Sequence, residues 1–180
     1  VETKFETEAP LIPEMVFVKG GIIEGADYPW APPKGNFPKG RRVQLSDFAI
    51  GKYEVTQEEY YSVMKAEVVS VTAYVDGVGE RTAEFFMDSR PSFCKPNNPP
   101  YHCFEGENQE RRPVEGITFY DALWYCNVLS RKTDLEPVYK IKVTEVTSVN
   151  FSSHITNAEV EIIPGANGYR LPTACEAEYA

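Results

Sequence analysis

Cysteine and histidine side chains are the residues of this chain that could act as nucleophiles or metal ligands. The sequence holds four cysteines, Cys94, Cys103, Cys126 and Cys175, which permit three complete disulfide pairings. Cys94 and Cys103 flank a short loop, so a disulfide between them is one alternative. Cys126 is expected to be a free thiol, because a free cysteine commonly packs as a small buried hydrophobe. The cysteines alone therefore leave the redox compartment open.

The two histidines, His102 and His154, show no pattern that indicates catalysis. Both lie in segments expected to be loops, and neither has an evident partner for a catalytic triad. His102 and Cys103, together with Cys94, offer ligand atoms for a metal ion, but they lack the repeated spacing of zinc sites. The sequence contains no phosphate-binding loop and no nucleophile elbow. We therefore predict no catalytic, cofactor-binding or metal-binding residues, and the sequence does not identify residues that bind a ligand.

The acidic composition narrows the class of partner. The 180 residues carry a net charge of −9, with a pI near 4.8, whereas surfaces for nucleic acid or anionic membranes need clustered Lys and Arg. No run of about twenty apolar residues occurs, so no membrane-spanning segment is expected. The length fits one domain, and 42% hydrophobic residues can fill a sizeable core. The polar, acidic start of the chain predicts an N-terminal tether over residues 1–13.

Three helix starts are encoded by local capping motifs. At each of them a threonine is followed three residues later by an acidic residue, which is the pattern of a capping box. The pattern predicts a helix start, because each of the two side chains accepts a hydrogen bond from the other residue's backbone N–H. Apolar residues recur at helical spacing after the first two starts. The predicted helices are residues 56–65, residues 118–132 and a third that starts at Thr173.

Short strands are predicted where apolar and β-branched residues cluster or alternate. The segments with this pattern are residues 14–19, 42–55 and 68–75. Asp76 and Gly77 form a turn signal after the last of them, and residues 80–88 are expected to be a short helix or irregular. Alternating residues 137–146 and 158–163, joined by residues 150–157, predict a β-hairpin at about 137–163.

Two segments rich in proline are expected to be long loops, namely residues 22–40 and residues 91–109. The first loop carries Tyr28 and Trp30. We interpret these two side chains as lids on the core in preference to exposed platforms for a ligand, because buried aromatic residues are commoner than binding ones. Long loops in compact domains often carry function, which makes the second loop a place to look for a site.

The end of the chain carries a family resemblance. Residues 168–180, GYRLPTACEAEYA, resemble the RLPTEAEWEYA signature of the formylglycine-generating enzyme family, also called the sulfatase-modifying-factor domain. Upstream matches to the family follow in the expected order: MVFVKGG at residues 15–21, DFAIGKYEVTQEEY at residues 47–60 and RPVEGITFYDALWYCNVLS at residues 112–130. Together these matches span nearly the whole chain, which is far more specific than a single short motif.

The resemblance implies an α+β fold of the C-type-lectin-like kind. Such a fold would have two main helices, short antiparallel strands and much irregular structure. Residues 14–180 would then be the N-terminal part of a single domain, with the hairpin at about 137–163 as an insertion that provides a binding surface in one interpretation. The chain does not begin with Met and stops soon after a helix starts, so it is expected to be the front part of a longer protein that has lost any signal peptide or lipid anchor.

The chain departs from the family signature at Ala174 and Ala177, where the family usually has Glu and Trp. We expect neighbouring side chains to have closed around Ala177, because protein interiors rarely keep large voids. The family's catalytic cysteines and calcium-ligand loops follow the signature, so copper or calcium is expected only beyond these 180 residues. The family fold would also place Cys126 near Cys175, which is the alternative to a free Cys126.

These observations favour a non-catalytic role. The chain is expected to be a ligand-binding or display protein, of which the variable proteins of bacterial diversity-generating retroelements are one group with this scaffold. The alternative is a copper-dependent formylglycine-generating oxidoreductase that acts on sulfatase cysteines, and a third reading is a structural or accessory subunit. We expect a protein or carbohydrate ligand, no nucleic acid, a monomer, and an extracytoplasmic or cell-surface location.

Overall fold

Helix α2, Phe119–Lys132, supplies more buried residues than any other described element. The structure, a computed structural model, describes residues 9–25, 35–75, 77–94, 106–149 and 152–180. The chain forms two compact units, which are described separately. Unit 1 consists of residues 1–12 and 54–170, and unit 2 consists of residues 13–53 and 171–180. The α+β class, with two main helices and short antiparallel sheets, is confirmed.

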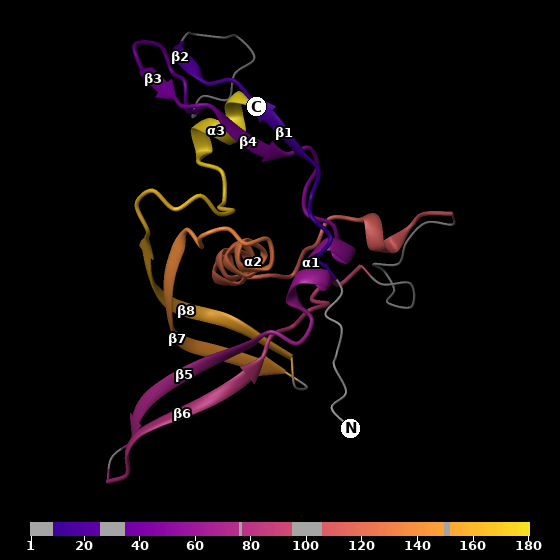
Figure 1. The fold of residues 1–180 in the computed structure, drawn as a ribbon, viewed down its shortest axis with the longest axis vertical. Helices are drawn as coiled ribbons and strands as arrows, with labels where there is room; N and C mark the ends of the chain where they lie inside the picture. Colours follow the sequence, from indigo (N-terminus) through magenta and orange to yellow (C-terminus); the bar gives the residue numbers. More distant parts are fainter. Residues whose placement is uncertain (1–8, 26–34, 76, 95–105, 150–151) are drawn as a thin grey trace. The chain divides into compact units, whose positions relative to one another are not determined.

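The two main helices of unit 1 begin where the capping motifs predict. Helix α1 is Gln57–Met64, with Thr56 as its N-cap, and helix α2 starts after Thr118 with Asp121 closing its capping box. The two helices are neighbours, and the rings of Tyr60 and Tyr125 stack with their centroids 5.3 Å apart (Figure 1). Most of α2 beyond its first turn is buried, so α2 supplies much of the core. None of the described helices is long and apolar enough to cross a membrane.

Strands β7, Tyr139–Val149, and β8, Ser152–Ile162, form an antiparallel hairpin that packs against α2. Val143 and Ile155 point into the core, whereas Lys140 and Lys142 pair with Glu161 and Glu159 across the hairpin. The prediction that residues 150–157 connect the two strands is wrong, because β8 already starts at residue 152. Its first residues look polar, but Ser153 and Ile155 alternate inward and are buried.

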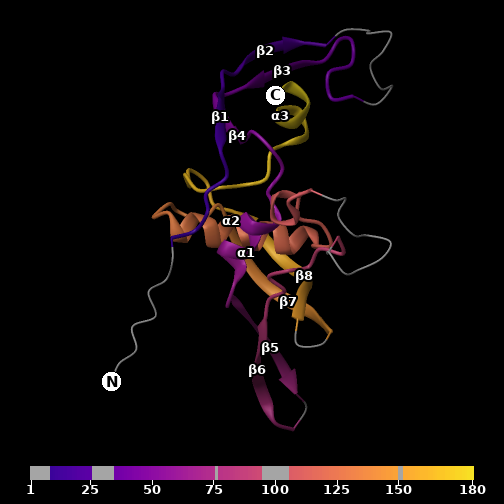
Figure 2. The ribbon, with the colours of Figure 1, turned by 90° about the vertical axis from the view of Figure 1, so that its right-hand side faces the viewer.

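Strands β5, Val68–Val75, and β6, Gly79–Phe86, form a second hairpin. The strand predicted at residues 68–75 is confirmed. The prediction of a short helix or irregular segment at residues 80–88 is wrong, since residues 79–86 pair one by one with β5. Gly77 and Gly79 have positive φ, which lets the chain reverse direction there. The inner end of the hairpin contacts β7 and β8, and its outer half runs away from α1 and α2 (Figures 1 and 2).

Unit 2 contains two small antiparallel sheets and a short helix. Strand β1, Met15–Val18, pairs with β4, Phe48–Gly51, and strand β2, Gly21–Glu24, pairs with β3, Arg42–Leu45. The strand predicted at residues 14–19 is confirmed. The single extended segment predicted at residues 42–55 is instead two strands, and part of the loop predicted at residues 22–40 is strand β2. Tyr28 and Trp30 lie outside the described residues.

Helix α3, Ala174–Tyr179, belongs to the second chain segment of unit 2 and is bonded to the first segment. It begins with the predicted capping box of Thr173 and Glu176. Asn36 donates from its backbone to the Glu178 carboxylate at 2.6 Å, and the Tyr179 hydroxyl donates to the Lys19 carbonyl at 3.3 Å. Ala177 is exposed, so the expectation that neighbours have closed around it is wrong.

Candidate functional site

A fully buried carboxylate lies at the first turn of α2. The Asp121 side chain has no exposed surface, and its two oxygens accept hydrogen bonds from the backbone N–H of Thr118 at 3.1 Å and of Ile155 at 2.8 Å. The Thr118 hydroxyl donates in turn to the Ile155 carbonyl at 2.7 Å. The capping box that starts α2 therefore also fastens the helix to β8.

His154 lies between this carboxylate and a second one. Its Nδ1 is 2.7 Å from Asp121 Oδ2, and its Nε2 is 3.7 Å from Asp88 Oδ2. The hydrogen bond with Asp121 raises the pKa of His154; burial lowers this pKa, and the charges of Asp121 and Asp88 raise it further. The prediction that His154 lies in a loop without a partner is wrong. Its Nε2 faces a carboxylate, however, so the cluster is an acid–histidine–acid arrangement and not a nucleophile triad.

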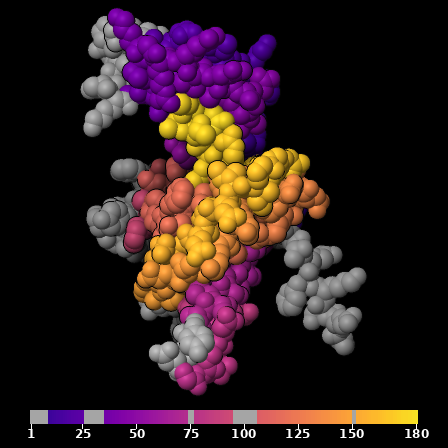
Figure 3. Space-filling view, turned by 90° about the vertical axis from the view of Figure 1, so that its left-hand side faces the viewer, coloured from indigo at the N-terminus to yellow at the C-terminus, as the bar shows by residue number. Residues whose placement is uncertain are grey.

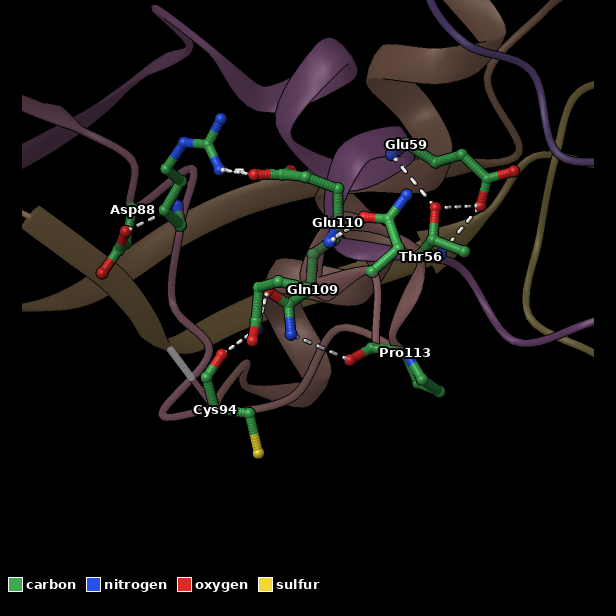
Figure 4. A network of polar contacts seen from close by, with 10 residues as sticks. Thr56, Glu59, Asp88, Cys94, Gln109, Glu110 and Pro113 are labelled. Carbon is green, nitrogen blue, oxygen red and sulfur yellow. Dashed lines mark hydrogen bonds and ion pairs between the residues drawn. The ribbon is translucent and has the colours of Figure 1, made fainter. Parts of the chain in front are cut away.

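A second polar network joins described residues on either side of residues 95–105, a segment that lies outside the described residues. The Gln109 side chain donates to the Cys94 carbonyl and to Gln57 Oε1, and Arg90 pairs with Glu110 at 2.9 Å (Figure 4). The Cys94 backbone N–H donates to Glu115 Oε1 at 3.0 Å. Much of the loop predicted at residues 91–109, with His102 and Cys103, lies outside the described residues. The network thus links Cys94, which precedes this segment, with Gln109, which follows it.

The described cysteines are free thiols. Cys94, Cys126 and Cys175 form no disulfide, so the prediction of a free Cys126 is confirmed, whereas Cys103 lies outside the described residues. Burial raises the pKa of the Cys126 thiol to about 12. A thiol with such a pKa stays protonated at neutral pH and is a poor nucleophile and metal ligand. Within the described residues, no group of three or more His, Cys, Asp or Glu side chains is arranged to hold a metal ion.

The outer half of the β5–β6 hairpin, residues 70–73 and 79–84, forms what we call the arm. Val69, just before it, is buried against the body, but almost every residue of the arm itself is exposed. The hydroxyls of Thr72 and Thr82 face each other across the strands at 2.8 Å. In Figure 3 the arm (magenta) protrudes beyond the strands β7 and β8 (orange to yellow). A two-stranded hairpin is marginally stable in water unless it packs on something.

Sequence reasoning did not find these features. The signal for the arm was present, because residues 68–75 and 79–86 are of equal length and flank the turn signal at Gly77. The hairpin at about 137–163, for which a binding surface is one interpretation from the sequence, contributes Val143 and Ile155 to the core. No local pattern links His154 to Asp88 or Asp121, so that cluster was visible only in three dimensions.

Comparisons with known proteins agree with the fold. Residues 1–180 match the family described as "Sulfatase-modifying factor enzyme 1-like domain". A protein of Paenibacillus barcinonensis named "Chaperone protein LppX" is 34% identical over 169 residues, which cover 93% of this chain and 44% of that protein. The chain thus spans less than half the length of the curated relative it matches.

Solved structures resemble the chain at lower identity. The Treponema denticola variable protein 1 superimposes with a TM-score of 0.50 and 23% identity, over 93% of this chain and 56% of that one. The structure of CarF gives a TM-score of 0.49 and 22% identity, over 92% of this chain and 54% of that one. At this identity, the likeness to the variable protein indicates a common fold and nothing about the ligand.

Proposed function

Since the chain belongs to the sulfatase-modifying factor enzyme 1-like domain family, we propose that it is a non-catalytic binding domain that holds a polypeptide ligand on the arm. The exposed arm is the observation that carries the proposal. Its residues are exposed on both faces of a two-stranded hairpin, although such a hairpin gains little stability by itself. A bound polypeptide that pairs with the arm would add a strand to this small sheet and supply packing that the hairpin lacks.

The chemistry of the arm suits an extended peptide. In the part of the chain that the structure describes, β5 and β6 pair only with each other. Each strand therefore has an outer edge whose backbone groups can pair with an added strand, which is the basis of β-augmentation. The relative that is 34% identical over most of this chain is named a chaperone protein, a term for proteins that bind other polypeptides. A display role, in which surface residues vary on a kept scaffold, is a narrower form of the same proposal.

The proposal is tested with a shortened arm. Ser70 and Glu84 are direct partners in the ladder, so replacing residues 71–83 by Asn-Gly closes the hairpin there with a two-residue turn. The control carries Lys142→Ala and Glu159→Ala, which remove an exposed pair from the β7–β8 hairpin. The probe is a fluorescently labelled, reduced and carboxymethylated α-lactalbumin, which is permanently unfolded. Binding is measured by anisotropy, and light scattering tests the expected monomer.

We expect the parent chain and the control to bind the probe, and the shortened arm to weaken binding by about tenfold or more, or about 1.4 kcal/mol. Equal binding by the shortened variant would contradict the assignment to the arm. A parent chain that binds glycans on an array, but not the unfolded protein, would show that the ligand is a carbohydrate. Cell fractionation tests the extracytoplasmic location that we propose with this function.

The family description favours a second candidate, a formylglycine-generating oxidoreductase that uses copper. Such chemistry needs thiolates in a suitable setting, and the buried Cys126 thiol with its raised pKa does not offer one. The test is incubation of the 180-residue chain with copper and a cysteine peptide of the sulfatase type. We expect no aldehyde above a control without protein, and aldehyde formation would favour this second candidate over the binding domain.

A further inference from the structure

The segment that follows β6 attaches the β5–β6 hairpin to β8. The Met87 backbone N–H donates to the Glu67 carbonyl at 2.9 Å, and the Asp88 N–H donates to the Ser153 carbonyl at 2.9 Å. Met87 also forms a parallel bridge with Ser153, and its side chain is buried. These two residues are therefore the point where the chain leaving the arm is docked on the body of unit 1.

His154 adjoins this attachment point, because it follows Ser153 in β8. Its side chain is 26% exposed and stands between Asp88, which is 21% exposed, and Asp121, which is fully buried. Asp88 Oδ1 also accepts the Arg90 backbone N–H at 2.9 Å. The ring of His154 thus links the carboxylate of the attachment segment with that of helix α2.

Among the described residues, the other elements near this cluster contribute neutral groups and one arginine that is paired elsewhere. Helix α1 contributes the Tyr60 phenol, whose pKa is raised by burial and by the nearby charges of Asp121 and Asp88, so the phenol stays neutral. Strand β7 presents Thr147 opposite His154. The Arg90 guanidinium, which follows Asp88 by two residues, is paired with Glu110. The protonation of the His154 imidazole therefore depends mainly on the carboxylates of Asp88 and Asp121.

We propose that His154 is a pH-sensitive latch that holds the base of the arm on β8. The protonated ring has two N–H donors, so it donates to Asp121 through Nδ1 and attracts Asp88 through Nε2. The neutral ring keeps one N–H, which the short contact assigns to Asp121. Its Nε2 then presents a lone pair toward the Asp88 carboxylate, and the attraction that held the attachment segment is lost. The latch does not depend on what the arm binds.

The direction of the pH effect follows from the cluster. The pKa of His154 is raised in the folded chain, above about 6.5 in the unfolded chain. The stabilising contact is fully present below the unfolded value and is lost as pH rises through the folded value. For each unit by which the folded pKa exceeds the unfolded pKa, the equilibrium constant for docking the attachment segment on β8 changes about tenfold. The arm is therefore held firmly in mildly acidic solution and is released as the solution becomes alkaline.

Hydrogen exchange of the Asp88 amide tests the latch in the full chain, because this N–H donates to β8. The chain contains two histidines, so His102→Gln is a matched control for His154→Gln. Exchange rates of the two variants are compared at the same pH, at about pH 5.5 and about pH 8, which cancels the intrinsic pH dependence of exchange. Amides in the middle of α2 report global opening, and NMR titration of the His154 ring gives its pKa.

We expect the Asp88 amide to exchange about tenfold or more faster in His154→Gln than in His102→Gln at the lower pH. The ratio of these two exchange rates should fall at the higher pH. The amides in the middle of α2 should exchange at the same rate in both variants. Asp88→Asn, which keeps the bond between His154 and Asp121, should lower the pKa of His154 and abolish the pH dependence. A ratio that is equal at both pH values, or a His154 pKa that Asp88→Asn leaves unchanged, would overturn the proposal. If His154→Gln does not fold, the Asp88→Asn titration decides alone.

Discussion

The buried Asp121 carboxylate gives the sharpest test of how unit 1 is held together. Asp121→Asn keeps the size of the side chain but leaves one carbonyl oxygen in place of two carboxylate oxygens. Those oxygens now serve separate donors, Ile155 N–H on one and Thr118 N–H with His154 on the other. The new amide must therefore turn its NH₂ group toward one of these backbone N–H donors. That N–H is then left without an acceptor, because the site is fully buried.

The cost follows from the hydrogen bonds that are lost. A hydrogen bond to a charged group contributes about 1.5–3 kcal/mol, and a buried donor left without a partner costs about 1–3 kcal/mol. Because these terms overlap, we expect Asp121→Asn to lower the free energy of unfolding by about 3 kcal/mol. The matched control is Asp134→Asn, at an exposed residue with positive φ, a conformation that Asn adopts readily.

Urea denaturation at pH 7, followed by circular dichroism, measures both variants. With an m-value of about 1–3 kcal/mol/M, a loss of about 3 kcal/mol moves the midpoint by about 1 M or more. The control should shift the free energy by less than about 0.5 kcal/mol, as surface substitutions usually do. If Asp121→Asn unfolds within the same margin as the control, the carboxylate does not fasten α2 to β8, and the reasoning from its hydrogen bonds fails.

Four further outcomes are expected. Ala66, with φ of 65°, should gain about 0.5–1 kcal/mol on replacement by Gly, seen as a higher urea midpoint; a lower midpoint would show that the conformation is not strained. Ile155→Ala should cost about 2–5 kcal/mol and Ile162→Ala under about 0.5, because the first side chain is fully buried and the second is 69% exposed. Cys126 should resist iodoacetamide in the folded chain at about pH 8 and react after denaturation, as mass spectrometry of its peptide would report; fast native labelling contradicts the burial. Ala177→Trp should change stability by less than about 0.5 kcal/mol in a thermal melt, since the site is exposed, and a large loss would mean that neighbours do crowd it.

Local chemistry explains why the helices were predictable. Each described α-helix starts at a threonine whose side chain and backbone bond with an acidic residue three positions on, so the start needs no distant partner. The β5 strand was equally clear from its β-branched residues. Strand β6 was not, because a segment such as GERTAEFF becomes a strand only by pairing with β5, and its own exposed face carries no alternation.

The candidate sites could not be predicted because they depend on contacts between distant residues. Asp121 and His154 are separated by 33 positions, and Asp88 lies as far again in the opposite direction from Asp121. Ser and Asn around His154 are typical of loops, which is why the start of β8 was missed. The exposure of the arm likewise depends on where the body of unit 1 ends, and this is a property of packing that no sequence pattern expresses.

The discontinuous make-up of unit 2 has a consequence for synthesis on the ribosome. Strands β1 to β4 emerge early, but the helix that joins them comes from residues 171–180, after all of residues 54–170. The bond between Asn36 and Glu178 closes a loop of 142 residues, and that between Tyr179 and Lys19 one of 160. Until then the nascent chain exposes Phe17 and Ile22. Both side chains stay largely exposed even in the folded unit. Synthesis at about 5–20 residues per second leaves these strands several seconds to meet a chaperone or another nascent chain before unit 2 can close.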